Sequence, residues 1–218
     1  MQTYDPKPRR RLWEVMKSQG MQENQQVVFL SDGGEDIRQV REYLHPNSEH
    51  VIDWFHITMR LTVLQQQAKA LQDAPPGKSG ASKQLESVKH LLWHGNVEEA
   101  LERLSNLLID LELTAIPSAP AEKLAAGVAE FETYIRNNQG SIPNYGERYR
   151  HGETISTAFV ESTINQVVSR RFVKKQQMHW TLRGAHLLLQ TRAKVLNNEL
   201  EIVFQRWYPL FRVQAKAA

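Results

Sequence analysis

Cysteine is absent from the 218 residues of this chain, so disulfides and thiolate zinc sites are excluded. That absence is in keeping with the reducing cytoplasm. No run of 18 apolar residues occurs, which argues against a transmembrane helix. The first 15 residues carry charges and lack the apolar core of a signal peptide. We therefore expect a cytoplasmic protein with no membrane partner.

Acidic residues are scarce near both ends of the chain. Residues 161–218 hold ten Lys and Arg against three Asp and Glu, and residues 1–20 hold five against two. Residues 21–160 carry a net charge of −7. Basic ends around an acidic middle indicate a surface that faces a polyanion, with ordinary solvated surface charge as the alternative.

Helix and strand patterns alternate over the first 60 residues. Short apolar runs with β-branched residues predict strands at 27–30 and 51–55, the first buried on both faces. Helical periodicity predicts helices at 9–20, 36–44 and from His56 to about Leu71. This alternation is typical of an α/β fold with parallel strands.

Strand patterns are absent from residues 61–138. Helices are expected at 82–94, 96–112 and 121–138, the second opened by Asn96 and Glu99 as a capping box. We interpret the block as an all-α insertion. A polar loop at 139–154 follows, then a helix at 157–176, one long helix at 181–204, and a tail that packs on the domain. The predicted fold is therefore α/β with a large all-α insertion, and predominantly helical overall.

Asp32 directly follows the first predicted strand and precedes two glycines. In open α/β sheets, functional sites lie at the carboxyl ends of the strands. Asp32 is therefore a candidate site residue. The alternative is that it caps the next helix.

Glu161 and Asn165 project onto the apolar stripe of their predicted helix, whereas Arg170 and Lys174 fall on the far side. An inward carboxylate needs a partner. A divalent cation shared with a second carboxylate would serve, as would a buried Arg or Lys. A structural ion pair or a position at the edge of the stripe is the alternative. The apolar members of the stripe are Ile164, Val168 and Phe172.

Two further groups of residues carry candidate chemistry. Asp53 and His56 have three possible roles. They could be an outer-shell pair that supports metal ligands, a helix N-cap next to a histidine with its own hydrogen-bond partner, or a metal site. We favour the first two roles. Arg148 and Arg150 alternate with tyrosines in the 139–154 loop, a pattern that suits nucleic-acid contacts and an ordinary surface loop equally well.

Three stretches, in this order, resemble DDE transposases of bacterial insertion sequences, and most closely the ISKra-type family related to the Mutator-like group. They are VVFLSDGG at 27–34, Asp53-Trp-Phe-His56, and FVESTINQ at 159–166 with Arg170, Arg171 and Trp180. The similarity covers essentially the whole chain.

The resemblance implies an RNase H-like core with an all-α insertion. It makes Asp32 and Glu161 the catalytic, metal-binding carboxylates, with Mg²⁺ or Mn²⁺ as cofactor. It assigns Asp53 and His56 to the family's C/D(2)H motif and counts Asn165 among the family-motif residues. Transposon ends and target DNA are the implied partners, together with a second copy of the chain, in the cytoplasm and at the nucleoid. The candidate DNA-contacting residues are Arg148, Arg150, Arg170, Arg171, Lys174 and Lys175.

One part of the family pattern is missing. The family's first catalytic Asp lies on an earlier strand, but only eight residues precede the first predicted helix, and Asp5 has no apolar strand around it. We therefore expect a partial RNase H-like fold and a C-terminal transposase fragment that is inactive alone. The predicted organisation is 1–60 as the first part of the core, 61–154 as the insertion and polar loop, and 155–218 as the closing helices. The alternatives are a non-catalytic remnant that binds DNA or full-length relatives, and a repair-type nuclease of the same fold.

Overall fold

The computed structural model describes residues 6–72, 80–113, 118–169, 172 and 179–210. The chain divides into two compact units, one of residues 13–157 and the other of residues 1–12 with 158–218. Helix α1 (Pro8–Ser18) spans the division. It starts at a proline, whose fixed φ suits the first turn, and ends just before Gly20, which has a φ of 97°.

The larger unit contains a two-stranded parallel sheet, β1 (Val28–Ser31) and β2 (Glu49–Ile52), joined by α2 (Glu35–Leu44). Both strands and their parallel pairing are therefore confirmed. The second strand ends at Ile52, three residues earlier than predicted, because the next helix already begins at Trp54. The prediction that β1 is buried on both faces is wrong. Val28 is 41% exposed, and β2 is the only strand that pairs with β1 among the described residues.

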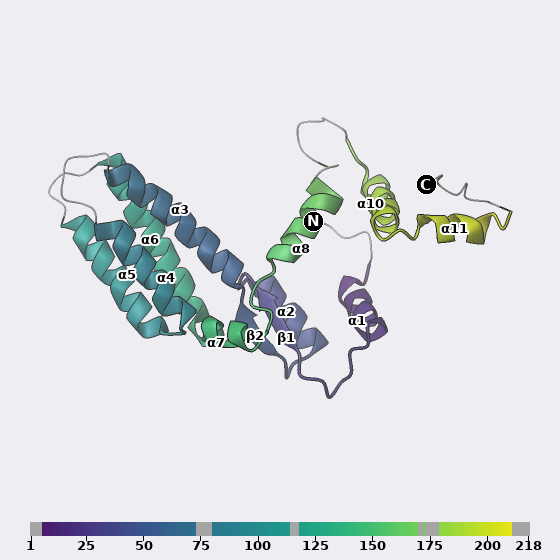
Figure 1. Ribbon diagram of the computed structural model, residues 1–218, viewed down its shortest axis with the longest axis horizontal. Coiled ribbons are helices and arrows are strands. Elements are labelled where there is room, and N and C mark those ends of the chain that lie inside the picture. The colour runs from purple at the N-terminus through teal and green to yellow at the C-terminus, as the bar shows by residue number, and fades with distance from the viewer. Residues whose placement is uncertain (1–5, 73–79, 114–117, 170–171, 173–178, 211–218) are drawn as a thin grey trace. The chain divides into compact units, whose positions relative to one another are not determined.

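Four helices follow and lie side by side (Figure 1): α3 (Trp54–Gln72), α4 (Gly80–Trp93), α5 (Val97–Glu112) and α6 (Ala119–Asn138). The described part of 61–138 contains no strand, as predicted. One continuous core joins these helices to β2, because Val51 and Ile52 belong to the same buried cluster as the helix side chains. The largest buried side chains of the helices are Ile57, Leu61, Leu85, Leu92, Leu104, Leu107, Leu124, Phe131 and Ile135.

Two local predictions in this unit are wrong. Asn96 precedes α5 but makes no side-chain cap, so the capping box does not form. The predicted loop at 139–154 contains a 3₁₀ turn, η1 (Gln139–Ser141), and a short helix, α7 (Tyr145–Arg150). Asn144 caps α7 by accepting from the N–H of Glu147 at 3.0 Å. The fully buried Tyr145 holds α7 in place by donating from its hydroxyl to the Ile52 carbonyl at 2.6 Å.

The smaller unit contains α8 (Ala158–Ile164), a π-helical turn η2 (Asn165–Ser169), α10 (Leu182–Leu196) and α11 (Leu200–Trp207). The prediction of one long helix over 181–204 is wrong. Asn198 adopts a left-handed φ of 57°, and the N–H of Glu199 bonds back to the Lys194 carbonyl at 2.8 Å. This pattern of hydrogen bonds terminates a helix, and asparagine tolerates the left-handed position.

The C-terminal tail belongs to the smaller unit, so its packing on the α/β domain stays a prediction. Trp207, Tyr208 and Leu210 are all exposed.

No helix in the described residues is both long enough and apolar enough to span a membrane.

Candidate functional site

The two parallel strands end side by side, and an aspartate follows each of them. Ser31 and Ile52 are partners in the sheet, and Asp32 and Asp53 come directly after them. The N–H of Asp53 donates to the Ser31 carbonyl at 2.8 Å. The predicted place of Asp32 at the carboxyl end of a strand is confirmed, and a second carboxylate lies at the same edge.

Asp32 lies in a tight turn between β1 and α2. Its Oδ1 accepts from the N–H of Gly34 at 3.0 Å, and the hydroxyl of Ser31 accepts from the N–H of Gly33 at 3.1 Å. Gly34 is the residue that precedes α2, and no side chain caps that helix. The interpretation of Asp32 as a helix cap is therefore wrong. The side chain is exposed, so its carboxylate is accessible to a ligand.

The back of this turn packs against α6. Gly33 has a φ of 89°, and a Cβ added there would lie 2.6 Å from Oδ1 of Asn138. Asn138 is itself nearly buried and fixed, because its Oδ1 accepts from Arg38 at 2.9 Å and its Nδ2 donates to the Tyr134 carbonyl at 2.8 Å. Side chains from α2 and α6 thus hold the turn that presents Asp32.

A chain of hydrogen bonds runs from the same turn through β2. The Ser31 hydroxyl lies 2.8 Å from Nε2 of His50, and Nδ1 of His50 lies 3.0 Å from the hydroxyl of Ser141. Burial lowers the pKa of His50 below its usual 6.5, and the positive charges of Arg41 and Arg38 lower it further. His50 is therefore neutral at pH 7, and it can donate from only one ring nitrogen.

The lowered pKa of His50 predicts a pH-dependent stability. The unfolded chain binds the His50 proton more tightly than the folded chain, so the free energy of unfolding should decrease as the pH falls below about 6.5. His50→Gln should remove this contribution. Urea unfolding at pH 7.5, 6.5 and 5.5 measures it as a smaller decrease for the variant than for the wild type. Parallel decreases in the two proteins would contradict the prediction.

Asp53 is completely buried and its carboxylate is engaged on both oxygens. Oδ1 accepts from the N–H groups of Phe55 at 2.9 Å and Thr157 at 3.2 Å, and Oδ2 accepts from the Thr157 hydroxyl. Nε2 of His56 lies 3.8 Å from Oδ2. The bond to Phe55 confirms the helix-cap interpretation, because it satisfies a donor in the first turn of α3. The two bonds to Thr157 were not expected.

Tyr134 of α6 brings a further group to this edge of the sheet. Its hydroxyl is buried and has no hydrogen-bond partner in the described part of the chain. Burial raises the pKa of Tyr134 to about 12, and the carboxylates of Asp32 and Asp53 act in the same direction. Arg60 opposes them, with its guanidinium 4.4 Å from the ring centre. Both strand-end aspartates are thus near one phenol.

Glu161 lies in the first turn of α8, which belongs to the smaller unit of the chain. It is half-exposed, Asn165 is exposed, and no residue of α8 is buried. Each unit is described by itself, so it stays a prediction that Glu161 and Asn165 face the interior of the core. A helical projection at 100° per residue fails beyond Ile164, because a π turn begins at Asn165 and contains more residues per turn. Arg192 supports this turn with bonds to the carbonyls of Gln166 and Val167.

Asp32 and Glu161 belong to different units, and the structure describes each unit by itself. That these two carboxylates share a metal ion therefore stays a prediction.

The predicted DNA-contacting residues have different surroundings. Arg148 is mostly buried and donates to Glu49 and to Glu153, the latter at 2.9 Å, so its charge is neutralised inside the protein. Arg150 is exposed. The remaining four, Arg170, Arg171, Lys174 and Lys175, lie outside the described residues.

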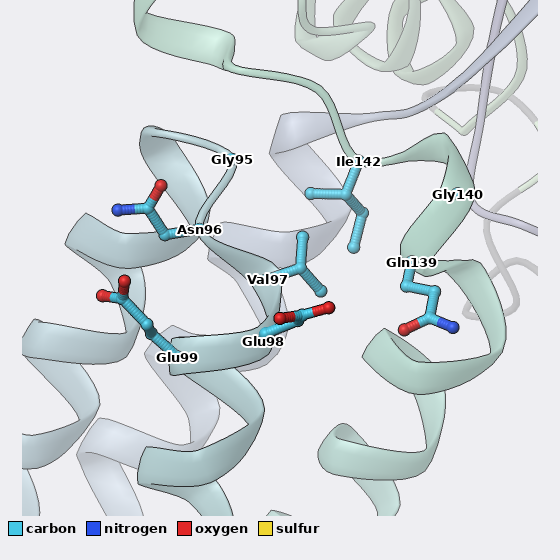
Figure 2. Close-up of a pocket in the computed structure, with 8 residues that line it drawn as sticks. All are labelled: Gly95, Asn96, Val97, Glu98, Glu99, Gln139, Gly140 and Ile142. Carbon is cyan, nitrogen blue, oxygen red and sulfur yellow. The ribbon is translucent and has the colours of Figure 1, made fainter.

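A pocket of about 510 Å³ opens at the start of α5 (Figure 2). The first residues of α5, with Glu98 and Glu99, lie across from Gln139, Gly140 and Ile142. No histidine or third carboxylate lines this pocket. Its two carboxylates fall short of the three His, Asp or Glu side chains that a candidate metal site would need.

The described residues fit the magnesium implied by the family only in part. The exposed Asp32 carboxylate offers the hard oxygen that Mg²⁺ prefers. Both oxygens of Asp53 are already engaged. No group of three His, Asp or Glu able to hold a metal is found within the described ranges. The fit is therefore to one ligand position, and not to a complete site.

Several residues at this edge of the sheet were not predicted as site residues. His50 was missed because the second strand was predicted to begin at Val51. Ser141 was assigned to a loop, and Tyr134 and Asn138 carried only the periodicity of their helix. Thr157 stood at the start of a predicted helix, where a threonine commonly caps. No sequence signal pairs it with Asp53, 104 residues away.

No protein-family model, curated protein or solved structure matches the chain.

Proposed function

We propose that the chain is part of the catalytic machinery of an ISKra-type DDE transposase with a partial RNase H-like core. Its reaction would be the cleavage and joining of DNA by metal-dependent phosphoryl transfer. The observation that carries the proposal is the exposed Asp32 carboxylate, held in a fixed turn at the carboxyl end of a parallel strand. Sites of α/β proteins occupy this position.

Asp32 and Glu161 are the proposed metal-binding carboxylates, as the resemblance implies. Mg²⁺ or Mn²⁺, when bound, would activate the attacking oxygen and stabilise the leaving one. The role of Asp53 differs, because its carboxylate is engaged by Phe55 and Thr157. Its bonds fix Thr157, four residues before Glu161 in the chain, so we assign Asp53 a positioning role and not a ligand role.

The test replaces magnesium by Fe²⁺ in the full chain and maps backbone cleavage by hydroxyl radicals, which act close to the bound ion. We expect cleavage near residue 32 and near residue 161, suppressed by excess Mg²⁺. Asp32→Asn and Glu161→Gln should each abolish both cleavages, and Glu102→Gln, an exposed change on α5, should abolish neither. Cleavage at only one position, or at neither, would contradict a shared ion.

A second candidate function is DNA binding without catalysis. It is favoured because both oxygens of the Asp53 carboxylate already accept hydrogen bonds from Phe55 and Thr157. Sites for two metal ions use more carboxylates than Asp32 and Glu161 supply. We therefore expect the 218-residue chain assayed alone to show no cleavage or strand transfer on DNA that carries the element's ends. Activity that is lost in Asp32→Ala and Glu161→Ala would show that Asp5, Asp53 or a second subunit completes the site.

The basic C-terminal region is predicted to contact DNA phosphates. Changing Arg170, Arg171 and Lys174 to alanine should reduce the slope of log K against log salt by about 2–3, since each phosphate contact contributes about 0.9. Fluorescence anisotropy with duplex DNA at several salt concentrations measures this slope. The charge-matched control changes Lys83, Arg103 and Lys123, which are exposed in the larger unit. An equal slope in the two triple variants would argue against the contact.

A further inference from the structure

A second pocket, of about 440 Å³, lies beside the sheet on the side of η1. It is formed by α2, by β2 and the turn before it, by η1, and by the segment that connects η1 to α7. Its polar lining consists of Arg41, Ser48, Glu49, His50, Gly140 and Ser141. None of these residues has a part in the proposed phosphoryl transfer.

Arg41 is a half-buried cation to which the described residues supply no counter-charge. In the described part of the chain its guanidinium makes one long hydrogen bond, from Nη1 to the Ser48 carbonyl at 3.4 Å, and no carboxylate lies within ion-pair distance. Its Nε is buried and has no partner there. A partly desolvated charge is costly unless an opposite charge or strong acceptors compensate it. The guanidinium therefore has unused donors in a polar pocket.

The acidic residue of the pocket does not supply that compensation. Glu49 accepts instead from Arg148, which also binds Glu153 at 2.9 Å. The carboxylate of Glu49 is therefore committed to Arg148 and forms no ion pair with Arg41 in the described part of the chain. Burial lowers the pKa of His50, and the positive charges of Arg41 and Arg38 lower it further, so the charge of Arg41 reaches this part of the pocket.

The hydrogen-bond chain through His50 directs a second donor to the pocket. The Ser31 hydroxyl accepts from the N–H of Gly33 at 3.1 Å, and its oxygen lies 2.8 Å from Nε2 of His50. We assign the proton of neutral His50 to Nδ1, the tautomer in which the Ser31 hydroxyl donates to Nε2 and Nδ1 donates to Ser141 at 3.0 Å. The hydroxyl hydrogen of Ser141 is then free to point elsewhere, and Ser141 lines the pocket.

We propose that this pocket binds a phosphate-class oxyanion between the Arg41 guanidinium and the Ser141 hydroxyl. A guanidinium presents several donors in a fixed plane that matches phosphate oxygens, and the Ser141 hydroxyl, which lines the same pocket, adds a second donor. The phosphate is either free or part of a nucleic-acid backbone. The proposal extends beyond the transposase function, since it rests on the pocket alone.

The first experiment uses the unmodified full chain. Phenylglyoxal reacts with accessible arginines, and mass spectrometry reports the rate of modification at each position. Inorganic phosphate should slow the reaction at Arg41 and leave exposed Arg103 unaffected, relative to sodium chloride of equal ionic strength. Equal rates at Arg41 with phosphate, with a duplex oligonucleotide and with chloride would overturn the proposal.

The two sources of phosphate differ in the concentration that protects Arg41. Protection by the duplex at phosphate-group concentrations where inorganic phosphate has no effect assigns the site to a nucleic-acid backbone. Protection by inorganic phosphate at equal or lower concentration assigns it to free phosphate. Each result supports the oxyanion site and identifies its ligand.

Variants give an independent measurement by calorimetric titration with the better of the two probes. Arg41→Gln should weaken binding by about tenfold or more, and Ser141→Ala by several-fold, because charged hydrogen bonds are the stronger ones. Arg103→Gln removes the same charge from α5 and should bind as the wild type does. Wild-type affinity in Arg41→Gln would overturn the proposal. If that variant does not fold, the protection result in the unmodified chain decides.

Discussion

Asp53→Ala is expected to lower the free energy of unfolding by about 3–5 kcal/mol. The change leaves three donors, the N–H groups of Phe55 and Thr157 and the Thr157 hydroxyl, without their acceptor at a completely buried position. Each unsatisfied buried donor costs about 1–3 kcal/mol, and loss of a helix cap about 0.5–2 kcal/mol. Urea unfolding of the full chain, followed by tryptophan fluorescence, measures the change.

Two further variants separate the contributions of Asp53. Asp53→Asn keeps one acceptor oxygen for the N–H groups, so it should cost less than the alanine change. Thr157→Val removes the hydroxyl donor, and in combination with Asp53→Ala its effect should be less than additive, because the two residues share a bond. Additive effects, or a cost below about 1 kcal/mol for Asp53→Ala, would show that the bonds to Thr157 contribute little.

Gly33→Ala is the second change with a large expected effect, about 2–4 kcal/mol of unfolding free energy. A left-handed conformation costs a non-glycine residue about 1–2 kcal/mol. In addition, the new Cβ would lie 2.6 Å from Oδ1 of Asn138 and disturb its bonds to Arg38 and to the Tyr134 carbonyl. Thermal unfolding monitored by circular dichroism, together with urea titration, measures the loss.

Gly152→Ala is the matched control for Gly33. Gly152 has a similar φ of 74°, but no atom lies within 4 Å of an added Cβ. Its replacement should therefore cost only the conformational part, about 1–2 kcal/mol. Equal costs at the two glycines would mean that Asn138 yields freely. A smaller cost of Gly33→Ala in an Asn138→Ala background would confirm that the steric contact is responsible.

The local sequence was sufficient to predict most elements of the larger unit. Apolar runs with β-branched residues located both strands, and helical periodicity located α2 through α6 within a few residues. These patterns are readable because a strand or an amphipathic helix repeats its burial over consecutive residues. The place of Asp32 was predictable for the same reason, since it directly follows such a run.

Contacts between distant residues decided the remainder. Burial of Tyr145 against the Ile52 carbonyl made a helix of a segment with loop composition. The carboxylate of Asp53 is hydrogen-bonded by Thr157, and the turn that carries Asp32 packs through Gly33 against Asn138. No periodic pattern records such pairs, because each is a single contact across about a hundred residues. The sequence by itself determined the two strands and helices α2 to α6, because their burial repeats over consecutive residues. Only the tertiary structure decided which polar groups are engaged and which, such as Asp32 and Arg41, remain available to a ligand.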